Sequence, residues 1–336
     1  MRQQYLLGRY LRLKYIEKEP LIPDTIYRKD KGHQEVVIFA SNISRTIQSA
    51  EFLLQGLYPQ SKRVDFFIKQ EQIPFARPPL TIHNQEQLES KLGLKSLEYK
   101  IDPVDIVVFF GKDTVLRADQ CPDVKKILVD LKKTDEYLDL EKDFKEGYFK
   151  KIPSILNVTD LESFDRMRDI LDCRYAEGKY IANMTDEQFN EFMEQAEASY
   201  EYLHGNHQLN KLEVTGFFEH VKYFLENTYK NAESGKEIIE RMRIYIGHDR
   251  LIQPIMASFG ISLKRSPEFA SFLIFEMIQR EVDQVKSYYI KVKLNGKEQM
   301  VTGCSLIQSG LCEYNDFQKI LDSSSLENYD YTGYCQ

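Results

Sequence analysis

The sequence of 336 residues lacks long apolar segments and an excess of positive charge. No apolar run approaches the roughly 18 residues that a membrane-spanning helix needs. Lys and Arg total 45 against 52 Asp and Glu, which gives a net charge of −7, whereas broad nucleic-acid binding needs a basic face. The composition therefore argues against nucleic-acid binding and a transmembrane segment. With 42% hydrophobic residues, it is typical of a globular protein.

Metal-site and targeting patterns are also scarce. The five cysteines form no Cys-x-x-Cys pair, which argues against a zinc or thioredoxin-like site. The histidines of His204-Gly-Asn-His207 have no clear set of carboxylate or thiolate partners, so we predict no metal. The opening residues contain no apolar segment of a signal peptide. Three N-glycosylation acceptor patterns begin at Asn42, Asn157 and Asn183.

What the sequence does contain is a strand-like segment that stops in a His-Asp pair. Apolar and polar or aromatic residues alternate along 241–247, which predicts a buried strand in which Gly247 allows a bend or a close backbone approach. Residues 251–260 read as a helix with Gly260 just past its end. His248 and Asp249 are therefore expected at the carboxyl end of a strand, where open α/β sheets bind ligands.

A second strand-to-helix turn carries Arg45. Residues 35–41 are nearly all apolar, which predicts a buried strand of a parallel sheet. The helix predicted next runs over 44–56, with Ser44 as its N-cap and Gly56 where it ends. Because helix N-termini attract anions, the two turns could converge on one anion.

The residue types at these turns suit phosphate chemistry. A histidine at a helix start can hydrogen-bond a phosphate oxygen, and the neighbouring carboxyl group can give its proton to a leaving alkoxide. The alternative for the pair is that His248 is a polar loop residue and Asp249 an N-cap. The alternative for Arg45 is a solvated residue at a helix start.

The rest of the chain predicts an α/β fold with a helical insertion. A helix is expected over residues 2–19 and a third short buried strand over 105–110. From Cys121 the chain becomes charged and helical, so we predict a helical cap at 121–236 inserted into an α/β core of 1–120 and 237–336. The Asn295-Gly296 pair between alternating runs predicts a hairpin.

These segments, in this order, resemble the histidine acid phosphatases, the branch-2 histidine phosphatases that include prostatic and lysosomal acid phosphatases. Residues 2–12 resemble the first long helix of that family, and 44–59 its arginine-bearing helix start. His248-Asp249 and 288–296 resemble its carboxyl-terminal half. The resemblance implies a phosphoglycerate-mutase-like α/β/α sandwich with an inserted helical cap.

The resemblance also implies the chemistry, which is hydrolysis of small phosphate monoesters through a phosphohistidine, without a cofactor. Arg45 matches a phosphate-binding arginine, His248 a phosphate-contacting histidine, and Asp249 the acid that protonates the leaving alcohol. Arg250 stands where the family often has threonine. The resemblance implies a homodimer as a prior expectation.

The chain departs from the family at its start, because no Arg-His-Gly occurs in the 336 residues. In the family this motif holds the nucleophile on a central strand upstream of the first helix. The favoured expectation is an acid phosphatase whose nucleophile is encoded upstream of Met1. One alternative is a pseudoenzyme that binds phosphate without turnover. The other is a phytase or inositol-polyphosphate phosphatase, which the acidic cap disfavours.

The resemblance assigns the cysteines as well. It implies one bridge between Cys121 and Cys335 and a second between Cys304 and Cys312. Cys173 matches half of a third bridge, whose partner position holds Phe272. The expected compartment of the full-length protein is therefore oxidising, either secreted or lysosomal.

Overall fold

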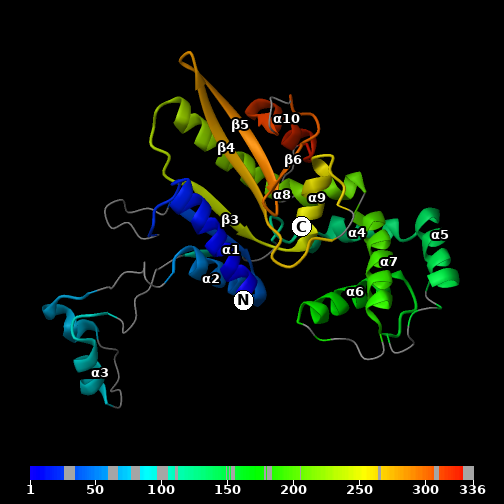
Figure 1. Ribbon diagram of the computed structural model, residues 1–336, viewed down its shortest axis with the longest axis horizontal. Coiled ribbons are helices and arrows are strands. Elements are labelled where there is room, and N and C mark those ends of the chain that lie inside the picture. The colour runs from blue at the N-terminus through cyan, green and yellow to red at the C-terminus, as the bar shows by residue number, and fades with distance from the viewer. Residues whose placement is uncertain are drawn as a thin grey trace. The chain divides into compact units, whose positions relative to one another are not determined.

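The computed structural model of the chain divides into two compact units (Figure 1). The first unit comprises Met1–Phe109 and Glu237–Ile246, and the second comprises Phe110–Lys236 and Gly247–Gln336. The structure describes residues 1–25, 35–59, 67–76, 84–96, 105–109, 113–148, 150, 152, 156–177, 179, 184–204, 206–263, 266–305 and 310–327.

The first unit contains the parallel sheet that the sequence predicts. Its strands are β1 (Val36–Ser41), β2 (Ile106–Phe109) and β3 (Met242–Ile246), in the order β2-β1-β3. Strand β1 pairs in parallel with both neighbours, and Ala40 lies opposite Ile246. The parallel α/β prediction is therefore confirmed, and β1 and β3 end at the same edge of the sheet.

The two faces of this sheet are covered unequally, which corrects the prediction of fully buried strands. Val36, Ile38 and Ala40 are at most 1% exposed, whereas Val37, Phe39 and all of β3 are half-buried. On the less covered face, the ring of Phe39 stacks with those of Phe109 and Tyr245 at centroid distances of 5.6 and 5.1 Å. Although the sequence of β1 is almost entirely apolar, one face of the strand carries large side chains that are only half-buried.

Two helices complete the described core of the first unit. Helix α1 (Arg2–Arg12) continues into the π-helical turn η1 (Leu13–Lys18), which confirms the predicted helix, and α2 (Ser44–Leu57) follows β1. The helices cross at Gly8 and Gly56, where a Cβ on either glycine would lie 2.0 Å from a backbone carbonyl oxygen of the other helix. Gly56 therefore lies within the helix, because close packing rather than termination requires a glycine there. The same unit contains the 3₁₀ helix η3 (Gln70–Ala76) and α3 (Gln85–Leu92).

Residues 121–236, for which cap is used below as the name of this sequence range, contain helices and no strand in their described part, as the sequence predicts. The helices are α4 (Pro122–Leu131), α5 (Asp135–Asp143), η5 (Phe144–Tyr148), α6 (Leu161–Ala176), α7 (Asp186–His204) and α8 (His207–Glu233). Helices α5, η5, α6 and α7 share an apolar cluster centred on Phe164 and Phe192, both fully buried. The centroids of those two rings are 4.6 Å apart, so this part of the cap has a core of its own.

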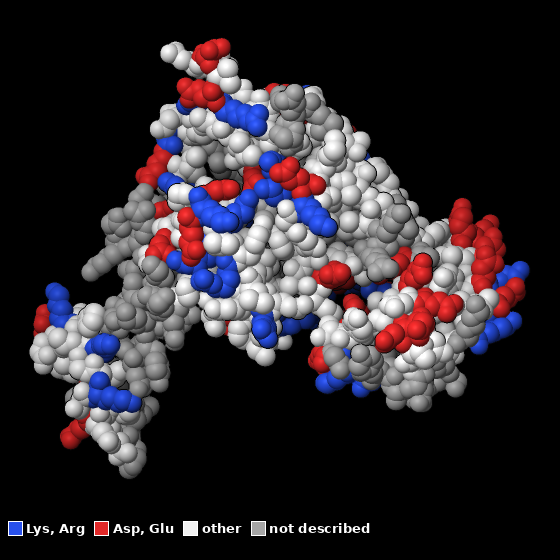
Figure 2. Space-filling view, viewed as in Figure 1, with Lys and Arg blue, Asp and Glu red and all other residues white. Residues whose placement is uncertain are grey.

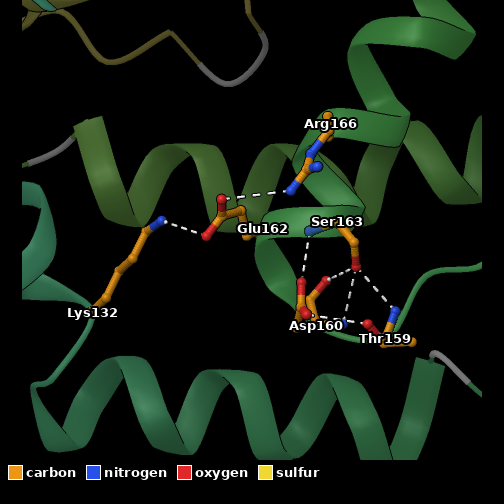
Figure 3. Close-up of polar contacts among 6 residues, drawn as sticks. All are labelled: Lys132, Thr159, Asp160, Glu162, Ser163 and Arg166. Atoms are coloured by element: carbon orange, nitrogen blue, oxygen red, sulfur yellow. Dashed lines mark hydrogen bonds and ion pairs between the residues drawn. The ribbon is translucent and has the colours of Figure 1, made fainter.

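Side chains also fix the ends of the cap helices (Figure 3). At the start of α6, Asp160 accepts a hydrogen bond from the backbone N–H of Ser163 at 2.7 Å, and the Ser163 hydroxyl accepts one from the backbone of Asp160 at 3.1 Å. This reciprocal pair satisfies two N–H groups that a helix start leaves open. Beside it, Glu162 pairs with Lys132 of the α4–α5 link at 3.1 Å and with Arg166 at 3.5 Å.

A second, antiparallel sheet occupies the carboxyl-terminal half of the second unit. Strand β4 (Leu273–Val282) pairs along its length with β5 (Val285–Leu294), which also pairs with β6 (Lys297–Gln299) and β7 (Leu311–Glu313). Asn295 and Gly296 connect β5 to β6 with φ of 49° and 79°, which confirms the predicted hairpin. The β4–β5 turn places Asp283 and Gln284 at positive φ.

Aromatic packing holds helix α9 (Asp249–Ser258) against its neighbours. The ring of Phe259 contacts those of Phe218 on α8, Phe275 on β4 and Phe317 on α10 (Tyr314–Ser323), with centroid distances of 5.6 to 6.0 Å. Gly260 follows with φ of 74°, as expected for a residue just past a helix end. Helix α9 is therefore fixed at its carboxyl end.

The disulfide prediction is confirmed for one pair. Cys304 and Cys312 form a bridge with Cα atoms 5.0 Å apart. Cys121 is also disulfide-bonded, whereas its predicted partner Cys335 lies outside the described residues. Cys173 is exposed.

Candidate active site

The turn from β1 into α2 carries Arg45. Ile43, with extended φ and ψ of −136° and 136°, is the N-cap, and Ser44 is already the first helical residue, which corrects the prediction that Ser44 caps the helix. The Thr46 hydroxyl donates to the carbonyl oxygen of Ser41 or Ile43, each at 2.8 Å. This hydrogen bond holds the turn between β1 and α2. Within the described residues no side chain caps this helix start, and Arg45 is exposed on its first turn.

The turn from β3 into α9 carries the His-Asp pair. His248 is the N-cap, with extended φ and ψ of −129° and 158°, and Asp249 is the first helical residue. The alternative in which Asp249 caps the helix is therefore wrong. His248 is half-buried and Asp249 exposed, and no described side chain caps this start either. The prediction that the pair follows a strand and opens a helix is confirmed.

The two turns are related through the sheet. Because Ala40 pairs with Ile246 in parallel register, the carboxyl ends of β1 and β3 lie at the same edge of the sheet. Arg45 follows Ala40 by five residues, and His248 follows Ile246 by two. Arg45 and His248 thus each follow the carboxyl end of a strand, and the two strands are adjacent and parallel.

The segment 113–120 lies against the start of α9. The Leu116 side chain is 3.4 Å from where a Cβ on Gly247 would be, which is ordinary contact with a side chain and not the close backbone approach that the sequence suggested. The carboxylate of Asp113 accepts from the backbone N–H groups of Val115 and Leu116 at 3.2 and 2.8 Å. Burial nevertheless raises the pKa of Asp113 above its ordinary value, against those two hydrogen bonds.

An ion pair on this segment faces the His-Asp turn. Arg117 donates to both carboxylate oxygens of Asp119, at 2.8 and 2.7 Å. Burial would raise the pKa of Asp119, but hydrogen bonds from Arg117 outweigh it, with help from the positive charges of Arg117, Arg250 and His248. The net result is a pKa below the ordinary value, so Asp119 is a fixed negative charge in the electrostatic neighbourhood of His248 and Arg250.

A buried glutamate lies on helix α8, which packs against α9. Glu213 is only 4% exposed and belongs to α8, which packs against α9 and the 3₁₀ turn η4 (Ala118–Gln120). Burial raises the pKa of Glu213 to about 7; the charge of Arg250 opposes this shift and that of Asp119 adds to it. Sequence reasoning missed this residue, although a lone carboxylate between Leu212 and Val214 in an apolar run was the available signal.

The cap contributes a further charged contact near Asp249. Arg168 on α6 donates to the Ser266 hydroxyl at 3.0 Å, and the Ser266 backbone N–H donates to Glu197 on α7 at 2.7 Å. One turn along α6, burial raises the pKa of Asp172, Arg168 lowers it, and the negative charges of Asp249 and other neighbours raise it further. Asp172 and Asp249 therefore lie within electrostatic range of each other.

The chain resembles known proteins over nearly its whole length. Residues 1–295 match the sequence model of the histidine phosphatase superfamily (branch 2). Human lysophosphatidic acid phosphatase type 6 is 23% identical over 338 aligned positions, which cover 100% of this chain and 67% of that protein. Lysosomal acid phosphatase of Xenopus laevis is 20% identical, covering 98% and 68%. The chain spans about two thirds of the length of these relatives.

Solved structures support the fold. The phytase of Klebsiella sp. ASR1 superposes with a TM-score of 0.61 at 13% identity, covering 96% of this chain and 83% of that one. The phytase of Citrobacter braakii gives 0.58 at 12% identity, covering 96% and 86%. At these identities the likeness concerns the fold alone. No helix among the described residues has the length and apolar character that crossing a bilayer requires.

Proposed function

This chain belongs to branch 2 of the histidine phosphatase superfamily, and we propose that it is the phosphate-binding and acid-supplying part of a phosphomonoester hydrolase that works through a phosphohistidine. Its relatives are acid phosphatases, so the substrate class is small phosphate esters. The individual residue roles below are proposals for this chain.

Arg45 and His248 are proposed to bind the phosphoryl oxygens, and Asp249 to protonate the leaving alcohol. The observation that carries this assignment is the register of β1 and β3, since adjacent parallel strands lead into the Arg45 turn and the His248-Asp249 turn. Both turns open helices whose starts have no described side-chain cap. Backbone N–H groups at such starts can bind an anion.

The nucleophile is the one part that these residues do not supply. No Arg-His-Gly occurs among the 336 residues, and neither His248 nor Asp249 is proposed to attack phosphorus. For the 336-residue chain assayed by itself we therefore expect anion binding with little or no turnover. A pseudoenzyme would behave in the same way. The two functions are distinguished by joining the chain to a strand segment that carries Arg-His-Gly-x-Arg. Hydrolysis gained by that addition favours the hydrolase.

The binding proposal is tested with tungstate, a tetrahedral oxyanion, by titration calorimetry. Arg45→Ala and His248→Ala should each weaken binding by about tenfold or more, as expected for lost charge-assisted hydrogen bonds. The matched controls Arg174→Ala and His207→Ala remove the same residue types elsewhere on the chain, and they should leave the affinity unchanged. Equal affinity in the wild-type chain and the two site variants would disprove the proposal.

The acid role has its own test in any form of the protein that turns over. Asp249→Asn should slow an alkyl phosphate more than p-nitrophenyl phosphate, because only the poor leaving group needs the proton. Equal slowing of the two substrates would remove Asp249 from that role.

Charge disfavours a phytase as the second candidate. Residues 121–236 contain 24 Asp and Glu against 16 Lys and Arg, and Figure 2 shows acidic side chains gathered over the region of α5 to α7. A site for a highly phosphorylated inositol needs a basic surrounding. We expect lysophosphatidic acid, the substrate class in the name of one relative, to compete with tungstate better than inositol hexakisphosphate.

We also propose the surroundings in which the protein works. The Cys304–Cys312 bridge and a lysosomal relative support a secreted or lysosomal compartment. Asn42 and Asn157 are exposed, which suits glycosylation, and Asn183 lies outside the described residues. Residues 121–236 are proposed to be a cap inserted into the core, and a homodimer is proposed on family grounds.

A further inference from the structure

Three charged residues lie on or near the first turn of α9 and have no assigned role in the proposed hydrolysis. Arg250 directly follows Asp249 and is exposed, Asp119 lies on the segment that packs against Gly247, and Glu213 lies buried on α8. Their elements pack against one another, since α8 contacts both α9 and η4. The three form one cluster within the second unit.

The charges in this cluster balance pairwise. Arg117 donates a hydrogen bond to each carboxylate oxygen of Asp119. These two bonds fix the position of the negative charge of Asp119. Arg250 acts electrostatically on Asp119 and on Glu213, and in each case it favours the charged carboxylate. A nearly fully buried carboxylate is costly when charged unless a cation compensates it. Arg250 is the cation that α9 provides.

We propose that Glu213, Arg250, Asp119 and Arg117 form one charged group at the start of α9, and that the charge of Glu213 sets how strongly the His248–Arg250 turn binds an anion. Arg250 and Glu213 then act on the bound anion through their charges. The inference rests on the proposed function, because the anion is the phosphoryl group of that site.

The pH dependence follows from the burial of Glu213. Burial raises its pKa to about 7, so the side chain is neutral in acid and negative in weak base. A negative Glu213 cancels Arg250, while Asp119 is already negative and paired with Arg117. The turn is therefore more positive, and binds an anion more strongly, below pH 7 than above it.

Sulfate is the probe, because it keeps its double negative charge between pH 5 and 9, whereas phosphate titrates there. Calorimetry on the full chain at pH 5.5 and 8.0 compares Glu213→Gln with wild type. We expect equal affinity at pH 5.5 and about three- to tenfold tighter binding by the variant at pH 8.0, as one nearby charge is removed. A merely structural role would change the affinity in the same direction at both pH values, and that result would overturn the proposal.

Arg250→Gln provides the opposite arm. It should weaken sulfate binding at both pH values, and the double variant with Glu213→Gln should recover part of the loss at pH 8.0. Arg174→Gln, an exposed arginine at the end of α6, is the matched control and should change nothing. Failure of the double variant to recover any affinity would contradict the charge balance.

A separate readout distinguishes failure of this inference from failure of the proposed function. If the wild-type chain binds no sulfate, the proposed anion site is wrong. The titration of Glu213 can still be followed by carboxyl ¹³C NMR in the ligand-free chain, assigned with Glu213→Gln. The midpoint is expected near pH 7, and Arg250→Gln should raise it. A midpoint that Arg250→Gln leaves in place would refute the cluster by itself.

Discussion

Helices α2 and α9, which follow strands of the parallel sheet, begin differently from three of the helices within 121–236. In the cap, the side chains of Thr134, Asp160 and Asn206 accept hydrogen bonds from the first turns of α5, α6 and α8. At α2 and α9 the N-caps are Ile43 and His248, and no described side chain makes such a bond. Helices α3, α4 and α10 also begin without a side-chain cap. The missing cap at α2 and α9 therefore leaves backbone donors open, and the binding role proposed there rests on Arg45 and His248.

The cap and the rest of the chain also differ in charge. The cap holds 24 acidic and 16 basic residues, and the remaining chain holds 28 and 29. Residues 121–236 are thus acidic and contain three helices with side-chain caps, whereas the turns that follow the parallel sheet carry Arg45 and His248.

The largest effect is expected where α1 and α2 cross. Gly8→Ala would bring a Cβ to 2.0 Å from the carbonyl oxygen of Leu53, so the helices must separate, at a cost of about 3 kcal/mol or more. Gly147→Ala in the cap is the matched control, since nothing lies within 4 Å of a Cβ there. Denaturant unfolding should show a large loss only for Gly8→Ala. A similar change in both variants would contradict the tight crossing.

The next effect concerns Glu213 and depends on pH. Its pKa is about 7 in the folded chain against 4.5 as the ordinary value, so the folded state keeps the proton longer. The stability from this group is full below pH 4.5 and is lost as pH rises through 7, on the order of 3 kcal/mol in total.

Glu213→Gln removes that dependence. The unfolding free energy of the variant relative to wild type should therefore rise between pH 4.5 and 7.5, measured by urea titration at each pH. A constant difference across this range would show that Glu213 titrates normally.

A smaller effect tests the cap side of the comparison. Asp160→Ala removes the acceptor for the Ser163 N–H and should cost about 1 kcal/mol of unfolding free energy. Ile43→Ser is the opposite change, because it adds an acceptor at the start of α2. It should weaken tungstate binding by competing for the same donors, whereas Asp160→Ala should leave binding unaffected. Weaker binding in Asp160→Ala would break the distinction between the two kinds of helix start.

The smallest effect is expected at the surface of the cap. Glu162 is 63% exposed and pairs with Lys132 and Arg166. Exposed ion pairs contribute about 0.5 kcal/mol or less, so Glu162→Gln should shift the thermal midpoint by no more than about 2 °C. A larger shift in calorimetry would mean that the three residues act as a network.

Sequence patterns predicted the elements whose signals are local. The apolar run at 35–41 and the alternation at 241–247 gave two of the parallel strands, and Asn295-Gly296 gave the β5–β6 turn. The ten-residue β4 was not assigned, because its turn uses Asp283 and Gln284 at positive φ without a glycine. Such a turn has no strong sequence signal.

The candidate site was predictable only in part, for a physical reason. Arg45, His248 and Asp249 stand at strand-to-helix transitions that a sequence can reveal. Glu213 owes its raised pKa to tertiary burial, which no local pattern encodes. Asp119 owes its lowered pKa first to Arg117, two residues away, and only then to Arg250 and His248. Gly56 was likewise taken for a helix end because its partner, Gly8, lies 48 positions away in the chain.

The central proposal, which rests on the family match, is that Arg45 and His248 bind the same phosphoryl group. Amide hydrogen exchange of the full chain, with and without tungstate, tests it most directly. Slower exchange is expected at residues 44, 45, 249 and 250 with a single shared dissociation constant, and both effects should be lost in Arg45→Ala as well as in His248→Ala. Protection of only one turn, or two different constants, would contradict the account.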